Sequence, residues 1–110
     1  MKKLSRSTMK TYRLEYSEIA IADLQHLALF ATAMHTLDFA RRYTARLRSE
    51  IESLSYLADM LPKSKYRLPL LYHPEGKTLP VGNNRLTVIF HIDGETVFVD
   101  KILPSAMMTH

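Results

Sequence analysis

Three side chains near the C-terminal end, Arg85, His91 and Asp100, supply a cation, a base and a carboxylate. An imidazole titrates near neutral pH and can remove a proton, and a guanidinium can stabilise the negative charge of a phosphorane. RNA cleavage by attack of a 2′-hydroxyl group needs such a set, and Arg67 and Lys101 are further candidate cations. Whether these groups can act together depends on the strands that carry them.

Two runs rich in β-branched and aromatic residues, 86–92 and 95–103, flank Asp93-Gly94. Asp-Gly in this position predicts a two-residue hairpin turn, in which Ile92 pairs with Glu95. Alternate residues then share a face. The face predicted to pack on the core holds Leu86, Val88, Phe90, Val97 and Val99, and the opposite face holds Arg85, Thr87, Ile89, His91, Thr96, Phe98, Asp100 and Ile102.

The predicted register separates the base from the carboxylate. Asp100 falls opposite Thr87, and at about 3.3 Å per residue it lies roughly 13 Å from His91. That distance is too long for Asp100 to orient the imidazole, whereas a diagonal ion pair with Arg85 is within reach. We therefore interpret His91 as a solvated or hydrogen-bonded strand residue and predict no catalytic residue from this pattern.

The N-terminal half has helical periodicity after a short strand at residues 12–16, and Ser17 and Thr36 can cap two helices. Each helix has one apolar stripe, which indicates a helical hairpin that packs on a sheet. Asp23 and His26 lie off the first stripe and are predicted to contact solvent. The stripes are Ala20, Ile21, Leu24, Leu27, Ala28 and Ala31, and then Ala40, Tyr43, Leu47, Ile51 and Leu54.

Two extended segments are predicted between the helices and the hairpin. Residues 66–72 resemble an edge strand, because Pro69 cannot donate to a central ladder. A turn at residues 73–76 precedes a second extended segment at 77–81. The predicted fold is α+β, with a short N-terminal strand and a two-helix hairpin packed on a small antiparallel sheet. We expect one domain over residues 11–108, after a flexible segment at residues 1–10.

The composition limits the chemistry. The chain of 110 residues has a net charge of +4, which favours an acidic partner, either nucleic acid or an acidic protein segment. It has no cysteine, which rules out thiol chemistry and fits a cytoplasmic protein. Neither a metal-ligand spacing nor a glycine-rich phosphate loop is present, so no metal or cofactor is expected. No apolar run is long enough to span a membrane.

Basic residues concentrate in the second predicted helix and the loop after it. Such a stretch is either a solvated surface or a docking patch for phosphates or acidic side chains. The candidate partner-binding residues are Arg41, Arg42, Arg46, Lys63, Lys65, Arg67, Lys77, Arg85 and His91.

The order of several motifs resembles the ParE/RelE toxins of bacterial toxin–antitoxin pairs. Each motif is short, but together they cover about residues 11–108. Residues 12–24 are similar to the opening of these toxins and 40–54 to their second helix. The Leu-Pro-Val-Gly at 79–82 and the segments 88–94 and 97–103 look like the Phe-Pro-Val-Gly and closing hairpin of the ParE branch.

The resemblance implies a cognate antitoxin that wraps the toxin with an acidic, partly disordered segment in a hetero-oligomer. ParE-branch toxins poison DNA gyrase, whereas RelE-branch toxins cut mRNA in the ribosomal A site without a metal. RelE-type cleavage needs basic residues and a Tyr or His near the C-terminus. Here the last tyrosine is Tyr72, and His110 alone lies near the end. The resemblance therefore favours a gyrase inhibitor over an endoribonuclease.

Two departures from the ParE pattern bear on toxicity. The family commonly ends in Ile-Leu-His-x-Arg-Met-Asp, and here Pro104, Ala106 and Met108 stand where His, Arg and Asp are usual. Lys77 also stands where an arginine usually precedes Phe-Pro-Val-Gly. A weakened toxin that mainly binds its antitoxin as a co-repressor is therefore a third expectation.

Overall fold

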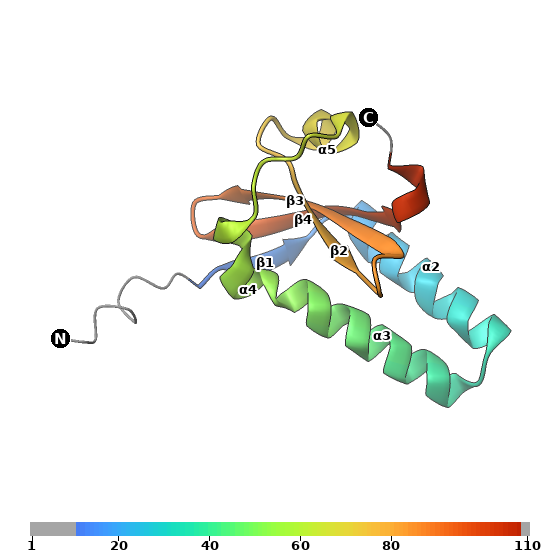
Figure 1. Ribbon diagram of the computed structural model, residues 1–110. Coiled ribbons are helices and arrows are strands. Elements are labelled where there is room, and N and C mark those ends of the chain that lie inside the picture. Colours follow the sequence, from blue (N-terminus) through green and yellow to red (C-terminus); the bar gives the residue numbers. More distant parts are fainter. Residues whose placement is uncertain (1–10, 109–110) are drawn as a thin grey trace.

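The computed structural model describes residues 11–108 and shows two long helices on one face of a four-stranded sheet (Figure 1). The α+β class is as predicted. None of the helices in this range has the length and apolarity to cross a membrane. In chain order the elements are β1 (Arg13–Tyr16), α2 (Glu18–Met34), α3 (Leu37–Glu52), α4 (Leu54–Leu57), η1 (Ala58–Met60), α5 (Arg67–Tyr72), β2 (Lys77–Val81), β3 (Leu86–Asp93), β4 (Thr96–Pro104) and η2 (Ser105–Met107).

The two predicted helix caps are confirmed. The Ala20 N–H donates to Ser17 Oγ over 2.9 Å, and the Phe39 N–H donates to Thr36 Oγ1 over 3.1 Å. Each bond satisfies an N–H group that has no partner within its helix. The apolar stripes of α2 and α3 face the sheet, although Ile21 is 45% exposed. Their buried members are Ala20, Leu24, Ala31, Ala40, Leu47 and Ile51, followed by Leu54 in α4.

The sheet has the order β1-β4-β3-β2. We predicted an antiparallel sheet, but the observed sheet is mixed. β1 pairs parallel to β4, with Arg13 opposite Thr96 and Tyr16 opposite Val99. Parallel neighbours need a long connection, which the helices and the β2–β4 meander supply. The start of α2 fixes the direction of β1, because the Ser17 N–H donates to the Val99 carbonyl oxygen at the end of the pairing.

The β3–β4 hairpin turns one residue later than predicted. Asp93 pairs with Thr96, so Gly94 and Glu95 form the turn. Of these residues only Gly94 has a positive φ, of 64°, which suits a turn with glycine at its first central position. A β-bulge then adds a residue to β4: Phe90 pairs with Val99 and Ile89 with Lys101.

The bulge changes which side chains reach the core. The five residues predicted for the core face are buried there, and Ile102 joins them although it was predicted on the opposite face. The extra residue in β4 reverses the alternation beyond it, because side chains along a strand alternate with period two.

Residues 66–72 do not form the predicted edge strand. Most of this segment is the helix α5, with Pro69 as its third residue. Proline is tolerated there because the first N–H groups of a helix have no intrahelical acceptor. Gly76 packs so closely on α5 that a Cβ atom on it would lie 2.3 Å from the Pro69 carbonyl oxygen. The extended segment at 77–81 is confirmed as β2.

Asp23 does not contact solvent as predicted; His26 does. The Asp23 carboxylate, 15% exposed, accepts from Lys101 Nζ at 3.0 Å and from the Ile102 N–H at 2.9 Å. These bonds fasten α2 to β4 at the point where the bulge turns the Lys101 backbone.

Candidate functional site

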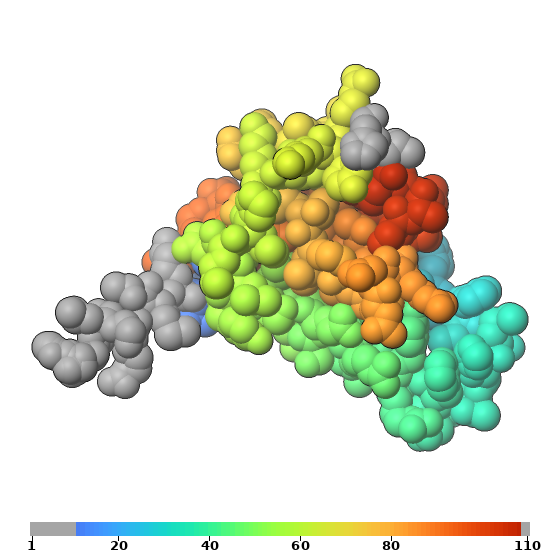
Figure 2. All heavy atoms as spheres, viewed as in Figure 1, coloured from blue at the N-terminus to red at the C-terminus, as the bar shows by residue number. Residues whose placement is uncertain are grey.

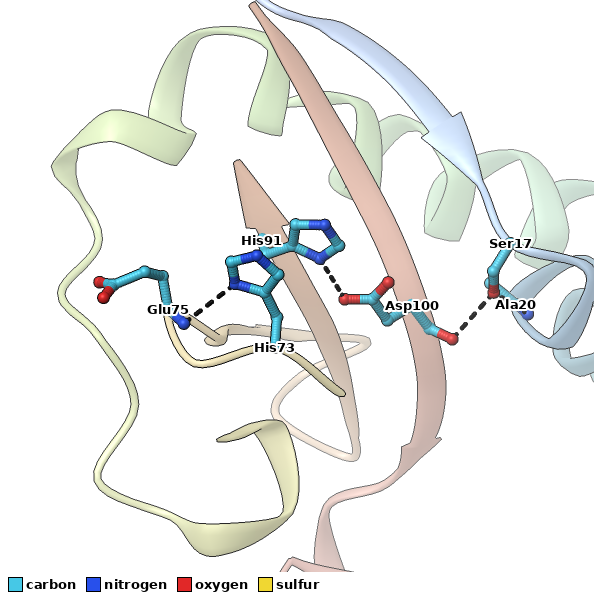
Figure 3. Close-up of polar contacts among 6 residues, drawn as sticks. All are labelled: Ser17, Ala20, His73, Glu75, His91 and Asp100. Atoms are coloured by element: carbon cyan, nitrogen blue, oxygen red, sulfur yellow. Dashed lines mark hydrogen bonds and ion pairs between the residues drawn. The ribbon is translucent and has the colours of Figure 1, made fainter. Parts of the chain in front are cut away.

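The later turn brings His91 and Asp100 together, so the predicted separation of about 13 Å is wrong. His91 Nδ1 lies 2.7 Å from Asp100 Oδ2 (Figure 3). His91 pairs with Phe98, and Asp100 lies two residues farther along β4, which makes the contact diagonal. The two side chains are only 15% and 14% exposed. The later turn is the physical reason for the error, because it moves the residue opposite His91 from Thr96 to Phe98.

A second imidazole covers the first. The His73 and His91 rings are parallel within 2°, with centroids 4.1 Å apart, and Phe98 stacks on His91 at 5.2 Å. His73 Nδ1 accepts from the Glu75 N–H at 3.0 Å, which places the proton of neutral His73 on Nε2. Figure 3 shows His73 reaching across from the turn after α5. The ring stack thus joins that turn to the sheet.

The bulge is also fixed from the helical side. Ser17 Oγ donates to the Asp100 carbonyl oxygen over 2.9 Å and accepts from the Ala20 N–H that it caps (Figure 3). Asp100 therefore connects the start of α2 to the imidazole. With His91 Nδ1–H donating to the carboxylate, Nε2 keeps a lone pair, which is the arrangement of a general base.

The predicted cations do not join this pair. Within residues 11–108, no hydrogen bond or ion pair links Arg67, Arg85 or Lys101 to His91. Lys101 is instead bound to Asp23 on α2. A general base without a cation is incomplete for RNA cleavage, because the phosphorane requires charge stabilisation.

Two of the predicted basic residues, Arg46 and Arg85, meet in a different place. They line an open groove of about 380 Å³ between α2, α3 and the turn that joins β2 to β3. Figure 2 shows that turn, in orange, beside the end of the helical hairpin, in teal and green. Much of the remaining lining is apolar or aromatic and includes Leu27, Phe30, Ala31, Phe39 and Tyr43. The groove combines apolar surface with two arginines and one carboxylate, that of Glu50.

The turn beside the groove has an unusual backbone. Gly82, Asn83 and Asn84 all have positive φ values, of 60°, 58° and 66°. Asparagine tolerates this region better than most residues, but it does so at some cost in strain. The Glu50 carboxylate holds the turn to α3 by accepting from the Gly82 N–H at 2.9 Å. This bond positions the segment that leads into Arg85.

The other predicted basic residues are dispersed. Arg41, Lys63, Lys65 and Arg67 are exposed, and Arg42 pairs with Asp38 at 3.3 Å in an exposed contact on α3. Lys77 Nζ donates to the Ala58 carbonyl oxygen at 3.2 Å, which is a structural bond. The structure therefore does not gather all of the predicted basic residues into one site.

Sequence reasoning missed His73 and Glu50. His73 belongs to a His-Pro-Glu-Gly turn, and the sequence alone shows no reason for its ring to reach β3. Glu50 is one of several charged residues around the α3 stripe. A weak signal did exist, because Glu50 lies one residue before the buried Ile51 and is itself partly buried.

The fold connects the chain to known proteins where the sequence does not. The sequence matches no protein-family model and no curated protein. The structure is similar to a chain of the chromosomal ParDE TA system from P. aeruginosa, with a TM-score of 0.72 and 15% sequence identity. The match covers 86% of this chain and 96% of that chain. This chain therefore shares the fold of that protein. In this fold, the groove adjoins the turn that follows the Leu-Pro-Val-Gly motif at 79–82.

Proposed function

We propose that this protein is the toxin of a type II toxin–antitoxin pair and that it acts by binding a macromolecule. The observation that carries the proposal is the fold, which is similar over most of both chains to a chain of a ParDE system. The net charge of +4 fits an acidic partner. The motifs of the ParE branch in the sequence support the same assignment.

The groove lined by Arg46 and Arg85 is the proposed binding site of the antitoxin. Its two cations and its apolar lining fit an acidic, amphipathic segment, which would bury apolar side chains and place carboxylates beside the arginines. Near the groove, α2 and α3 expose further apolar side chains, including Met34 at 62% and Leu37 at 55%. An antitoxin segment would cover this surface.

Reversing the charge of the two arginines tests this binding site. The partner to test is a short acidic protein encoded by a neighbouring reading frame, and affinity is measured by calorimetry. The double variant Arg46→Glu/Arg85→Glu should weaken binding by about 100-fold or more, because like charges would then face each other. The matched control is Arg41→Glu/Arg42→Glu, which changes the same charge on the outer side of α3 and should cost less than about 5-fold. Equal losses of affinity in the two double variants would show that the groove is not the antitoxin site.

DNA gyrase is the proposed target, on the strength of the ParE-branch resemblance. Purified protein should inhibit gyrase supercoiling and leave ribosomal mRNA intact. The altered tail at Pro104, Ala106 and Met108 is proposed to weaken inhibition, since the tail lacks the charge-assisted hydrogen bonds of Arg and Asp. Restoring Pro104→His, Ala106→Arg and Met108→Asp together should strengthen growth arrest at matched expression. Strong arrest by the parent chain, with no gain on restoration, would place the inhibitory surface elsewhere.

Ribosome-dependent RNA cleavage is a second candidate function, and one observation favours it. The 2.7 Å contact between His91 and Asp100 supplies the oriented base that the predicted register excluded. Codon-positioned cleavage by pure protein, lost in His91→Gln, would establish this function in place of gyrase inhibition. His73→Gln is a useful companion variant, because it changes the covering ring and leaves the His91–Asp100 pair in place.

A further inference from the structure

A second cavity, of about 460 Å³, opens between β1, α2 and α3. Its lining includes Tyr16 from β1, Gln25 and Ala28 from α2 and Arg48 from α3. It shares no lining residue with the groove of Arg46 and Arg85. The two hollows use different faces of α2, because Ala28 and Leu27 are separated by about 100° around the helix axis.

The Tyr16 hydroxyl group is buried and has no hydrogen-bond partner among residues 11–108. Leaving such a group unpaired is unfavourable, because burial has removed its hydrogen bonds to water. Burial raises the pKa of Tyr16 above its ordinary value of 10.0, the nearby Glu52 carboxylate raises it further, and Arg48 opposes the shift. The hydroxyl therefore stays protonated at neutral pH and can donate a hydrogen bond to an incoming acceptor.

Two more polar side chains of this cavity are available to bind a ligand. Within the described range, neither the Arg48 guanidinium nor the Gln25 amide forms a hydrogen bond or ion pair. Glu52 acts on Tyr16 but does not line the cavity, so the charge that faces the cavity is positive. Ile21 lines the same cavity and is 45% exposed, which gives it an apolar rim.

We propose that this cavity is a second docking site, which binds an Asp or Glu side chain of a protein partner. The carboxylate would pair with Arg48 and accept from the Tyr16 hydroxyl, while the stem of the side chain would contact Ile21 and Ala28. Charge complementarity and the unfilled hydrogen bond select an acidic group. The site rests on the proposed function in one respect, that the partner is a protein, and it stays open when an antitoxin segment occupies the first groove.

The probe is N-acetyl-glutamate N-methylamide, with the glutamine analogue as its uncharged match, and NMR follows the Tyr16 ring. The acid should bind saturably, with a Kd of about 1–10 mM, and the glutamine analogue at least ~5-fold more weakly. Arg48→Gln should abolish the preference for the acid. Tyr16→Phe should weaken binding by about 5-fold, and thermal unfolding confirms that this variant folds. Arg42→Gln, which removes an exposed arginine of the same helix, should change nothing.

Three results would overturn the proposal: no saturable shift at Tyr16 up to about 50 mM probe, equal binding of both analogues, or unchanged binding in Arg48→Gln. Free glutarate that binds more than about 10-fold tighter than the capped residue would assign the cavity to a small acid instead of a protein. The titration is repeated on the antitoxin complex, where the probe Kd should stay within about 2-fold. If Arg46→Glu/Arg85→Glu bound the antitoxin as tightly as the parent chain, the first groove would not be the antitoxin site. The probe titration at the second cavity does not depend on that result.

Discussion

Replacing Asp23 with alanine should lower the free energy of unfolding by about 1.5–4 kcal/mol. The larger part comes from the Ile102 N–H, which would lose its acceptor at 2.9 Å beside a buried strand. An unsatisfied buried N–H costs about 1–3 kcal/mol. Lys101, whose side chain is 29% exposed, would lose its partner as well, and water would compensate most of that charge, leaving about 0.5–1 kcal/mol.

Two variants separate these contributions. Asp23→Asn keeps an oxygen for the Ile102 N–H and should cost only the ion-pair part, about 0.5–1 kcal/mol. Asp38→Ala removes an ion pair whose side chains are 79% and 71% exposed, and it should cost less than about 0.5 kcal/mol. Urea unfolding followed by circular dichroism gives the three values, provided that the m-value is unchanged. If Asp23→Ala and Asp38→Ala agree within about 0.5 kcal/mol, Asp23 does not fasten α2 to β4.

The glycines, the buried tyrosine and the bulge give three further predictions. Gly76→Ala should lower the free energy of unfolding by about 2 kcal/mol or more, as measured by thermal unfolding, because its Cβ would lie 2.3 Å from a carbonyl oxygen of α5. Gly94→Ala should lower it by about 1 kcal/mol, because Gly94 lies in open space but has a φ of 64°. Burial raises the pKa of Tyr16, so the stability that its protonated hydroxyl group contributes is complete below pH 10.0. This contribution is lost as the pH rises through the pKa of the folded state. Tyr16→Phe should therefore reduce the decline of the unfolding free energy at alkaline pH. Asp100→Ala should cost about 1–2 kcal/mol and Asp100→Asn less, since the amide oxygen can still accept from the imidazole, as urea midpoints would show.

The parts of the fold that depend on local sequence were predictable. Both helix caps form where Ser17 and Thr36 precede an apolar stripe, and β2 has the predicted limits because a turn bounds it on each side. Such features depend on neighbouring residues alone. The core face of the hairpin was also correct, since five alternating apolar residues occupy it.

The candidate site was not predictable, because it depends on a register set over many residues. The turn forms one position later than predicted, with Gly94 at a positive φ, and this shift places Asp100 diagonally from His91. The covering ring of His73 comes from a segment that the pattern assigned to a strand and a turn. The sequence of 66–72 does not reveal the helix, because Pro69 fits both an edge strand and a first helical turn.

The parallel pairing of β1 with β4 has a consequence for how the protein is made. Arg13 donates to Thr96 Oγ1 across 83 residues, and the start of α2 is bound to β4 through Ser17 and Asp23. A chain still emerging from the ribosome has its helices long before the strand that holds them. Contacts of such sequence separation form late, so the native domain assembles only once β4 has been synthesised. An unfinished chain thus has no completed binding surface, and any inhibitory activity begins after translation of the chain has passed Leu103.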